Sequence, residues 1–231
     1  MIRTNGDKNM SKHSFQQWRL YVVTDEHLSR GRSHIEIARA AIAGGAVVIQ
    51  HRDKTASSGK FYRDAQEIRK LTREAGVAFI VNDNLDIALA VDADGLHIGQ
   101  NDLPAPKTRE LLGPDRILGV SAATVDEALQ AERDGADYLG VGPIFEARET
   151  KPDAGEPLGL QLLQTVREKC RLPIVAIGGI NEQNLASVIE AGADAAAVIS
   201  TVVQADDIAA KVRELTGIIN AARSGNRWRS R

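Results

Sequence analysis

Residues 134–142 read DGADYLGVG, and this stretch joins the end of a helical pattern to a short apolar run. Gly135 can adopt the left-handed backbone that ends a helix, while the residues from Tyr138 to Gly142 are almost continuously apolar. An apolar run without alternation is typical of a strand that is buried on both faces of a parallel sheet. The same order of small residues and apolar run recurs around residues 43–46, 75–76 and 191–194.

Eight short apolar runs of this kind alternate with helical stretches along the chain. They occupy residues 20–24, 47–50, 78–81, 95–98, 117–121, 138–142, 174–177 and 196–200. Strand-then-helix units of roughly 25 residues, repeated in this way, are right for a compact barrel of parallel strands. The sequence therefore predicts an α/β fold of the (βα)8 TIM-barrel type in a single domain. The alternative is a doubly wound open sheet, which would want a G-x-G-x-x-G turn after residues 20–24 and finds none.

Capping signals mark where several of the helices begin. Ser33 with Glu36, and Thr124 with Glu127, fit the S/T-x-x-E box, in which two side chains satisfy backbone donors at a helix start. Asn181 can cap another helix after the seventh apolar run. The helices are therefore expected between the apolar runs, as a barrel requires.

The ends of the chain and its composition limit what the protein can be. The barrel is expected at residues 19–222, between a polar tail at 1–18 and a basic tail at 223–231. With 29 Lys and Arg against 31 Asp and Glu, the chain has no overall attraction for nucleic acid, and a single Cys170 excludes an internal disulfide. Because no apolar stretch could span a bilayer or serve as a secretory signal, we expect a cytoplasmic protein without a membrane partner. The sequence leaves open whether the protein forms a homo-oligomer.

Polar residues follow the apolar runs, where the active site of a barrel is expected. Asp83 and Asp102 follow the third and fourth runs, so their loops can bring two hard oxygen ligands together for Mg²⁺. Alternatively, Asp83 caps the helix that comes next. Arg52, Lys54 and Lys151 add cations to the same rim. A metal ion with three cations describes a site for a diphosphate.

A second anion site is expected on the other side of the barrel mouth. Gly178 and Gly179 follow the seventh run and Ser200 follows the eighth, with a helix start expected near Ala205. Barrels commonly bind phosphate there through backbone N–H groups at helix N-termini. Otherwise the glycine pair only permits a tight turn.

Some chemistries are disfavoured by what the sequence lacks. No Lys lies inside an apolar run for a Schiff base, no G-x-S-x-G elbow exists, and the five His have no spacing for zinc. His97 lies within the fourth run and is expected to be a packed or hydrogen-bonded structural residue.

At these residues the sequence closely resembles the thiamine phosphate synthase family, from about Tyr21 to Ser200. The matching segments are Tyr21 to Asp25, Gln50-x-Arg52-x-Lys54, Asn82-Asp83, Ala93 to Gln100 with Asp102 to Pro104, Gly119 to Ser121, Gly135 to Tyr138, Gly142 to Phe145, Thr150-Lys151, and Ala176 to Ile180. The resemblance implies a transferase that uses Mg²⁺. It would join 4-amino-2-methyl-5-(diphosphooxymethyl)pyrimidine to a (carboxy)thiazole ethyl phosphate, which gives thiamine phosphate and diphosphate.

The resemblance also implies roles for individual residues. The segment expected to hold the pyrimidine diphosphate comprises Gln50, His51, Arg52, Asp53 and Lys54, with Asn82, Ser121 and Lys151. Among these, Ser121, Lys151 and Arg52 would be catalytic, and the Mg²⁺ ligands would be Asp83 and Asp102. The thiazole phosphate would be held by Arg148, Glu149, Thr150, Gly179, Ile199 and Ser200.

Two segments depart from the family pattern. The family usually has Leu and Glu at the positions of His51 and Asp53. The loop after Phe145 usually reads Pro-Thr-x-Thr-Lys, whereas here residues 146–151 read EARETK, one residue longer and without the first Thr. We expect Arg148 to replace the missing hydroxyl with a cation, and residues 146–155 to act as a lid.

Two other functions stay open at this point. One is a thiazole tautomerase on the same barrel, but that relative lacks the Gly-Gln-x-Asp motif and has a His where Pro143 stands here. The other is a non-catalytic barrel that binds or senses thiamine precursors. The altered loop is its only support, and the presence of both Asp83 and Asp102 disfavours it.

Overall fold

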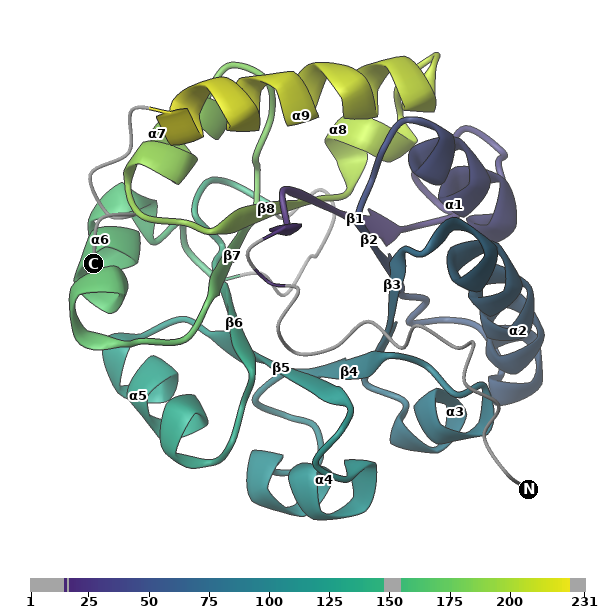
Figure 1. Cartoon of the computed structure of the whole chain (residues 1–231), viewed down its shortest axis with the longest axis horizontal. Helices are drawn as coiled ribbons and strands as arrows, with labels where there is room; N and C mark the ends of the chain where they lie inside the picture. The colour runs from purple at the N-terminus through teal and green to yellow at the C-terminus, as the bar shows by residue number, and fades with distance from the viewer. Residues whose placement is uncertain (1–14, 16, 148–154, 225–231) are drawn as a thin grey trace.

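A computed structural model describes residue 15 and residues 17–147 and 155–224. In this part of the chain, eight parallel strands form a closed barrel in sequence order (Figure 1). The strands are β1 (Leu20–Thr24), β2 (Val48–His51), β3 (Ala78–Asn82), β4 (Gly95–Ile98), β5 (Ile117–Ala122), β6 (Tyr138–Val141), β7 (Ile174–Ile177) and β8 (Ala195–Val198). β8 pairs with β1, with Ala196 opposite Leu20, and this pairing closes the barrel. The prediction of a TIM barrel is confirmed.

Helices form a ring around the barrel (Figure 1). They are α1 (His34–Ala43), α2 (Ser58–Ala75), α3 (Leu85–Ala90), α4 (Ala105–Leu112), α5 (Val125–Arg133), α6 (Gly159–Lys169), α7 (Leu185–Glu190), α8 (Ser200–Val203) and α9 (Ile208–Ser224). Ser33 and Glu36 form the full capping box before α1. Asn184, not Asn181, is the N-cap of α7, and α8 begins at Ser200, earlier than expected.

Thr124 caps α5 with one of the two hydrogen bonds of the expected capping box. Its side chain accepts the backbone N–H of Glu127, but the Glu127 carboxylate accepts the N–H of Ala123 (2.6 Å), one residue before the cap. The helix start is therefore satisfied as predicted, although the reciprocal bond goes to the neighbouring residue.

Successive residues of each strand face opposite sides of the barrel wall, as the strand period of two requires. One set packs outward against the helices and makes the larger apolar core. The other set points inward, and Trp18, Tyr21 and Tyr138 are the largest side chains of this inner core. A Cβ at Gly140 would lie 2.7 Å from the His97 ring, and one at Gly119 would collide with the Tyr138 ring, so these glycines make room for the inner rings.

Two residues that were expected in the tails, Trp18 and Arg223, are buried. Trp18, expected in the N-terminal tail, is buried, with its ring 5.6 Å from that of Tyr21 and 5.2 Å from that of Tyr138. Arg223, expected in the C-terminal tail, is also buried and donates to the backbone carbonyls of Trp18 (2.6 Å) and Asp194. Both residues are held by partners far away in the chain. Among the described residues, no helix is both long enough and apolar enough to span a membrane.

Candidate active site

A pocket with a volume of about 230 Å³ opens at the carboxyl ends of the strands. Its lining includes eight of the side chains expected from the sequence, namely Gln50, Arg52, Lys54, Asn82, Asp83, Asp102, Ser121 and Ile199. These residues come from segments scattered between β2 and β8. The barrel therefore brings these eight side chains to one cavity.

β2 and the residues after it supply the cationic side of the pocket. Gln50, Arg52 and Lys54 each lie two positions after the one before, and all three line the pocket. The Arg52 guanidinium lies 3.7 Å from the carboxylate of Asp25, and both side chains are mostly buried. Asp25 in turn accepts the backbone N–H of Leu28 (3.1 Å), so the arginine is held by the loop after β1.

Asp83 and Asp102 form the acidic side of the pocket. Asp83 has a left-handed backbone (φ 61°), its N–H donates to the His97 carbonyl (2.9 Å), and its carboxylate accepts from the Lys54 ammonium. Asp102 accepts the backbone N–H of Gly99 (2.7 Å). Burial raises the pKa of Asp102, and the hydrogen bond and negative charge of Asp83 raise it further. The two carboxylates are therefore close enough to repel each other.

This donor set fits a magnesium ion. Two carboxylates that repel each other gain from a shared cation, and hard oxygen ligands suit Mg²⁺ better than they suit softer metals. The alternative that Asp83 caps α3 is wrong, because Asn84 occupies the N-cap position.

His51 and Asp53 lie on the other side of the barrel wall, although both were expected at the substrate. Gln50 and His51 are successive residues of β2, so their side chains point to opposite sides of the wall. After the strand, Arg52 and Lys54 line the pocket, whereas Asp53 contacts His34. The His51 ring is fully buried between the rings of Phe61 (4.1 Å) and His34 (4.5 Å). Burial, with a smaller electrostatic contribution from the neighbouring His34, lowers the pKa of His51 to about 3.

Asp53 belongs to a polar network between α1 and α2. One carboxylate oxygen accepts the backbone N–H groups of Thr55 (2.8 Å) and Ala56 (2.9 Å), and the other lies 3.2 Å from Nε2 of His34. Burial alone would raise the pKa of Asp53, but these hydrogen bonds outweigh it and hold the pKa well below its usual range. Asp53 thus fixes the loop that carries Arg52 and Lys54.

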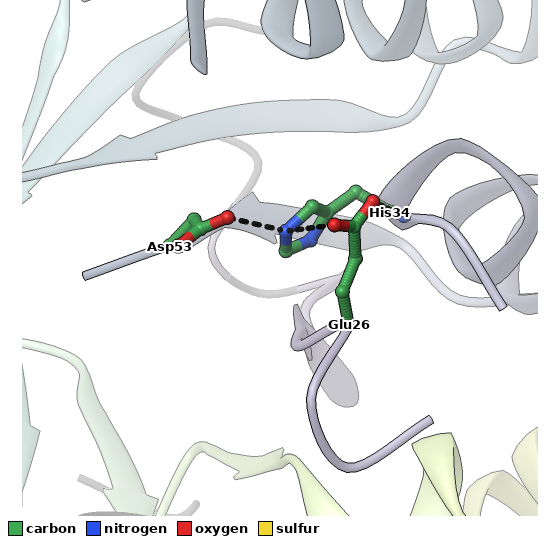
Figure 2. Close-up of side chains that lie close together, drawn as sticks. All are labelled: Glu26, His34 and Asp53. Carbon is green, nitrogen blue, oxygen red and sulfur yellow. Dashed lines mark hydrogen bonds and ion pairs between the residues drawn. The ribbon is translucent and has the colours of Figure 1, made fainter. Parts of the chain in front are cut away.

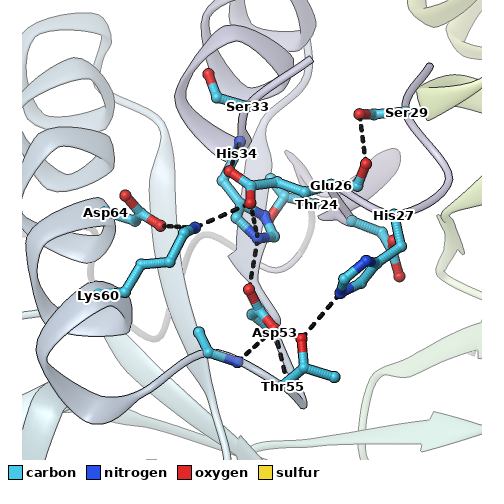
Figure 3. A network of polar contacts seen from close by, with 12 residues as sticks. Thr24, Glu26, His27, Ser29, Ser33, His34, Asp53, Thr55, Lys60 and Asp64 are labelled. Atoms are coloured by element: carbon cyan, nitrogen blue, oxygen red, sulfur yellow. Dashed lines mark hydrogen bonds and ion pairs between the residues drawn. The ribbon is translucent and has the colours of Figure 1, made fainter. Parts of the chain in front are cut away.

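The same network contains a His, Asp and Glu group, the arrangement that some metal sites use. Figure 2 shows the His34 ring between the carboxylates of Asp53 and Glu26, and their ligand atoms lie within 4.8 Å of one another. Figure 3 shows that the Lys60 ammonium bridges Glu26 (2.9 Å) and Asp64 (2.7 Å). Lys60 already neutralises Glu26, so this cluster is satisfied as an ion-pair network outside the pocket.

A chain of hydrogen bonds crosses the floor of the pocket. Gln50 Nε2 donates to the Tyr21 hydroxyl (2.8 Å), which lies 2.9 Å from the Tyr138 hydroxyl. His97 Nδ1 lies 2.9 Å from the same Tyr138 hydroxyl, and His97 Nε2 lies 3.0 Å from Ser121 Oγ. The sequence-based expectation for His97, a hydrogen-bonded residue, agrees with these contacts.

Tyr21 and Tyr138 were missed as site residues. The available signal was a tyrosine in an otherwise aliphatic run, since a buried phenol usually needs a hydrogen-bond partner.

The far side of the pocket is formed by the ends of β7 and β8. Gly178 and Ile199 line the pocket, whereas Gly179 and Ser200, their neighbours in sequence, do not. Gly179 has a left-handed backbone (φ 62°), and a Cβ there would lie 2.5 Å from the Glu146 carbonyl. It therefore permits close contact with the start of the altered loop. Arg148, Glu149, Thr150 and Lys151 lie outside the described residues, as does most of the expected lid.

Known proteins resemble this chain over nearly all of its length. A family model described as thiamine monophosphate synthase matches residues 20–202. The thiamine-phosphate synthase of Chloroflexus aurantiacus is 57% identical over 211 residues, which are 91% of this chain and 97% of that protein. The one from Moorella thermoacetica is 58% identical over 207 residues, 90% of this chain and 98% of that protein. The solved thiamine phosphate pyrophosphorylase of Pyrococcus furiosus has a TM-score of 0.83 and 40% identity, covering 90% of this chain and 98% of its own.

Proposed function

The chain belongs to the thiamine monophosphate synthase family of transferases, and we propose that its pocket joins 4-amino-2-methyl-5-(diphosphooxymethyl)pyrimidine to a (carboxy)thiazole ethyl phosphate. The products are thiamine phosphate and diphosphate. The observation that carries this proposal is the contact of Lys54 with Asp83 beside Asp102, within a pocket that Arg52 also lines. Cations and carboxylates together at one edge of a barrel mouth suit a diphosphate that arrives with a metal ion.

The cationic side would hold the leaving group. Arg52 and Lys54 bind the diphosphate oxygens, and Lys151 joins them from the loop after β6. Gln50, Asn82 and Ser121 complete the contacts to this substrate. Negative charge grows on the diphosphate as its C–O bond breaks, so cations fixed at that place lower the barrier. His51 and Asp53 are left out of this set because they face the helices.

Asp83 and Asp102 would hold the Mg²⁺. When bound, Mg²⁺ supplies positive charge to the diphosphate oxygens. Lys54 then has two roles, since its ammonium contacts Asp83 and also lines the pocket where the diphosphate would lie. Both carboxylates must be ionised to act as ligands.

The far side of the pocket would hold the second substrate. The thiazole phosphate is bound near Gly179, Ile199 and Ser200, with Arg148, Glu149 and Thr150 contributing from the loop. This position aims the thiazole nitrogen at the pyrimidine methylene. The C–O bond breaks with its electron pair going to diphosphate, and the nitrogen lone pair forms the new C–N bond. Orientation of two bound substrates supplies much of the rate, and no protein nucleophile is required.

An end-point assay tests this function. The purified protein is given both substrates and Mg²⁺, and thiamine phosphate and diphosphate are measured. We expect both products in equal amounts, and none after chelation or in an Asp83→Ala/Asp102→Ala variant. Asp92→Ala is the matched control, because Asp92 is an exposed carboxylate paired with Arg73 and Arg116. If the protein bound the thiazole phosphate without forming product, a tautomerase or a precursor-binding barrel would replace this proposal.

A further inference from the structure

The hydrogen-bonded chain beneath the pocket joins five strands and ends at a side chain of the proposed site. It runs from Gln50 on β2 through Tyr21 on β1, Tyr138 on β6 and His97 on β4 to Ser121 on β5. Each of its four links measures between 2.8 and 3.0 Å. Gln50, His97 and Ser121 all line the pocket together with both tyrosines.

One direction of donation along the chain starts at Gln50. The amide nitrogen of Gln50 can only donate, so the Tyr21 oxygen accepts there, and in this direction its own hydrogen goes to the Tyr138 oxygen. In the same direction, the Tyr138 hydrogen goes to Nδ1 of His97. A neutral imidazole whose Nδ1 accepts carries its hydrogen on Nε2, which donates to Ser121 Oγ.

Both phenols of the chain are buried. Burial raises the pKa of Tyr21 and that of Tyr138 above the ordinary value for a phenol. Both groups therefore keep the hydrogens on which the chain depends. Gly119 and Gly140 leave the space in which the Tyr138 and His97 rings meet.

We propose that Tyr21, Tyr138 and His97 are positioning residues that turn the Ser121 hydroxyl hydrogen into the pocket. Since Ser121 Oγ already accepts from His97, its own hydrogen is available to a substrate atom. Ser121 is thus a donor, and on the function proposed above its acceptor is an oxygen of the diphosphate. A donor at that position gains strength as negative charge grows on the leaving group. The opposite chain direction would offer a lone pair, which repels phosphate oxygens.

Nitrogen NMR of the protein with ¹⁵N-labelled histidine tests the direction without any turnover. The His97 signals are assigned by their loss in His97→Gln. We expect wild-type His97 to carry its hydrogen on Nε2. Tyr138→Phe removes the hydroxyl that donates to Nδ1 and is expected to change the tautomer, whereas Tyr21→Phe leaves that bond in place and is expected to preserve it. A wild-type Nδ1–H tautomer, or no change in Tyr138→Phe, would overturn the proposal.

Kinetics test whether the chain acts through Ser121. We expect Tyr138→Phe and Ser121→Ala each to lower kcat by about tenfold, with the KM for the thiazole phosphate unchanged, and the double variant to lose no more than either alone. Multiplied losses in the double variant would show that the two residues act independently. Tyr62→Phe is the control. The Tyr62 hydroxyl lies on α2, where it accepts a hydrogen bond from the exposed Gln66 (2.8 Å), and Tyr62 does not line the pocket. Absence of activity in the wild type would count against the proposed function. The His97 tautomer would still show the direction of the hydrogen-bonded chain.

Discussion

Arg52 and Asp53 are neighbours in the chain but face opposite sides of the barrel wall. Arg52 lines the pocket, whereas Asp53 hydrogen-bonds to His34 among the helices. Asp53 also accepts two backbone N–H groups of the loop that follows it. The outer residue of the pair thus holds the backbone from which the inner one reaches the site.

Replacing Asp53 by Asn should destabilise the protein in a pH-dependent way. Hydrogen bonds depress the folded pKa of Asp53, so its contribution is complete above the unfolded value of roughly 3.9 and is lost as the pH falls through the lower folded value. We expect a loss of about 1–3 kcal/mol at pH 7 that shrinks in acid. Urea unfolding at pH 7 and in acid, below the unfolded pKa, measures this loss, with Asp92→Asn as an exposed control. Equal losses at both pH values would contradict this assignment.

His51→Leu should make the protein more resistant to acid. Burial, assisted by the neighbouring His34, lowers the folded pKa of His51 to about 3, with Asp53 and Lys60 acting on it in opposite directions. Below an unfolded pKa of roughly 6.5 the unfolded chain binds a proton that the folded ring refuses, so wild-type stability is lost as the pH falls. Leu has no such loss. The difference in unfolding free energy should grow by about 1.4 kcal/mol per pH unit below 6.5. Parallel pH profiles for the two proteins would rule this out.

Gly179→Ala should weaken binding of the thiazole phosphate. The new methyl group would meet the Glu146 carbonyl and Phe145 Cβ (2.8 Å) and push the loop away from the end of β7. Gly45→Ala is the matched control, since Gly45 also has a positive φ (93°) but nothing within 4 Å of a Cβ. We expect both variants to lose about 1 kcal/mol of stability from the backbone, and only Gly179→Ala to raise the KM, by about tenfold. An equal KM in the two variants would remove Gly179 from the site.

Asp102→Asn should raise the Mg²⁺ concentration needed for activity. Loss of one charged ligand costs about 3 kcal/mol, which corresponds to roughly a hundredfold in the activation constant. Titration of Mg²⁺ at saturating substrates measures this constant. Asp115→Asn, an exposed carboxylate before β5, serves as the control and should not change it. An unchanged constant in Asp102→Asn would remove Asp102 from the metal site.

The barrel could be predicted because its strands are buried on both faces. The apolar runs at 20–24, 95–98 and 174–177 coincide with β1, β4 and β7, and the other runs differ from the strands by one or two residues. The ends were not predictable from periodicity. Trp18 and Arg223 are both buried, and a hydrogen bond joins the Arg223 guanidinium to the Trp18 carbonyl. These residues are 205 positions apart, and only the closed barrel brings them together.

The site was predictable where chemistry lies in short motifs. Gln50, Arg52 and Lys54 were found together, but the interpretation kept His51 and Asp53 with them, although the strand period of two already separates the sets. Tyr21 and Tyr138 could not be found in this way. They are 117 residues apart, and their hydroxyls meet only because β1 and β6 face each other across the barrel.

The bond from Arg223 to the Trp18 carbonyl also bears on how the protein is made. It ties the last helix to the residues that precede the first strand, next to the pairing of β1 with β8. Because synthesis starts at the N-terminus, β1 must wait with one edge unpaired until β8 has left the ribosome. The pocket takes side chains from β1 through the end of β8 and does not exist earlier. A translation product that stops before β8 should therefore be inactive and prone to aggregate through its open edges.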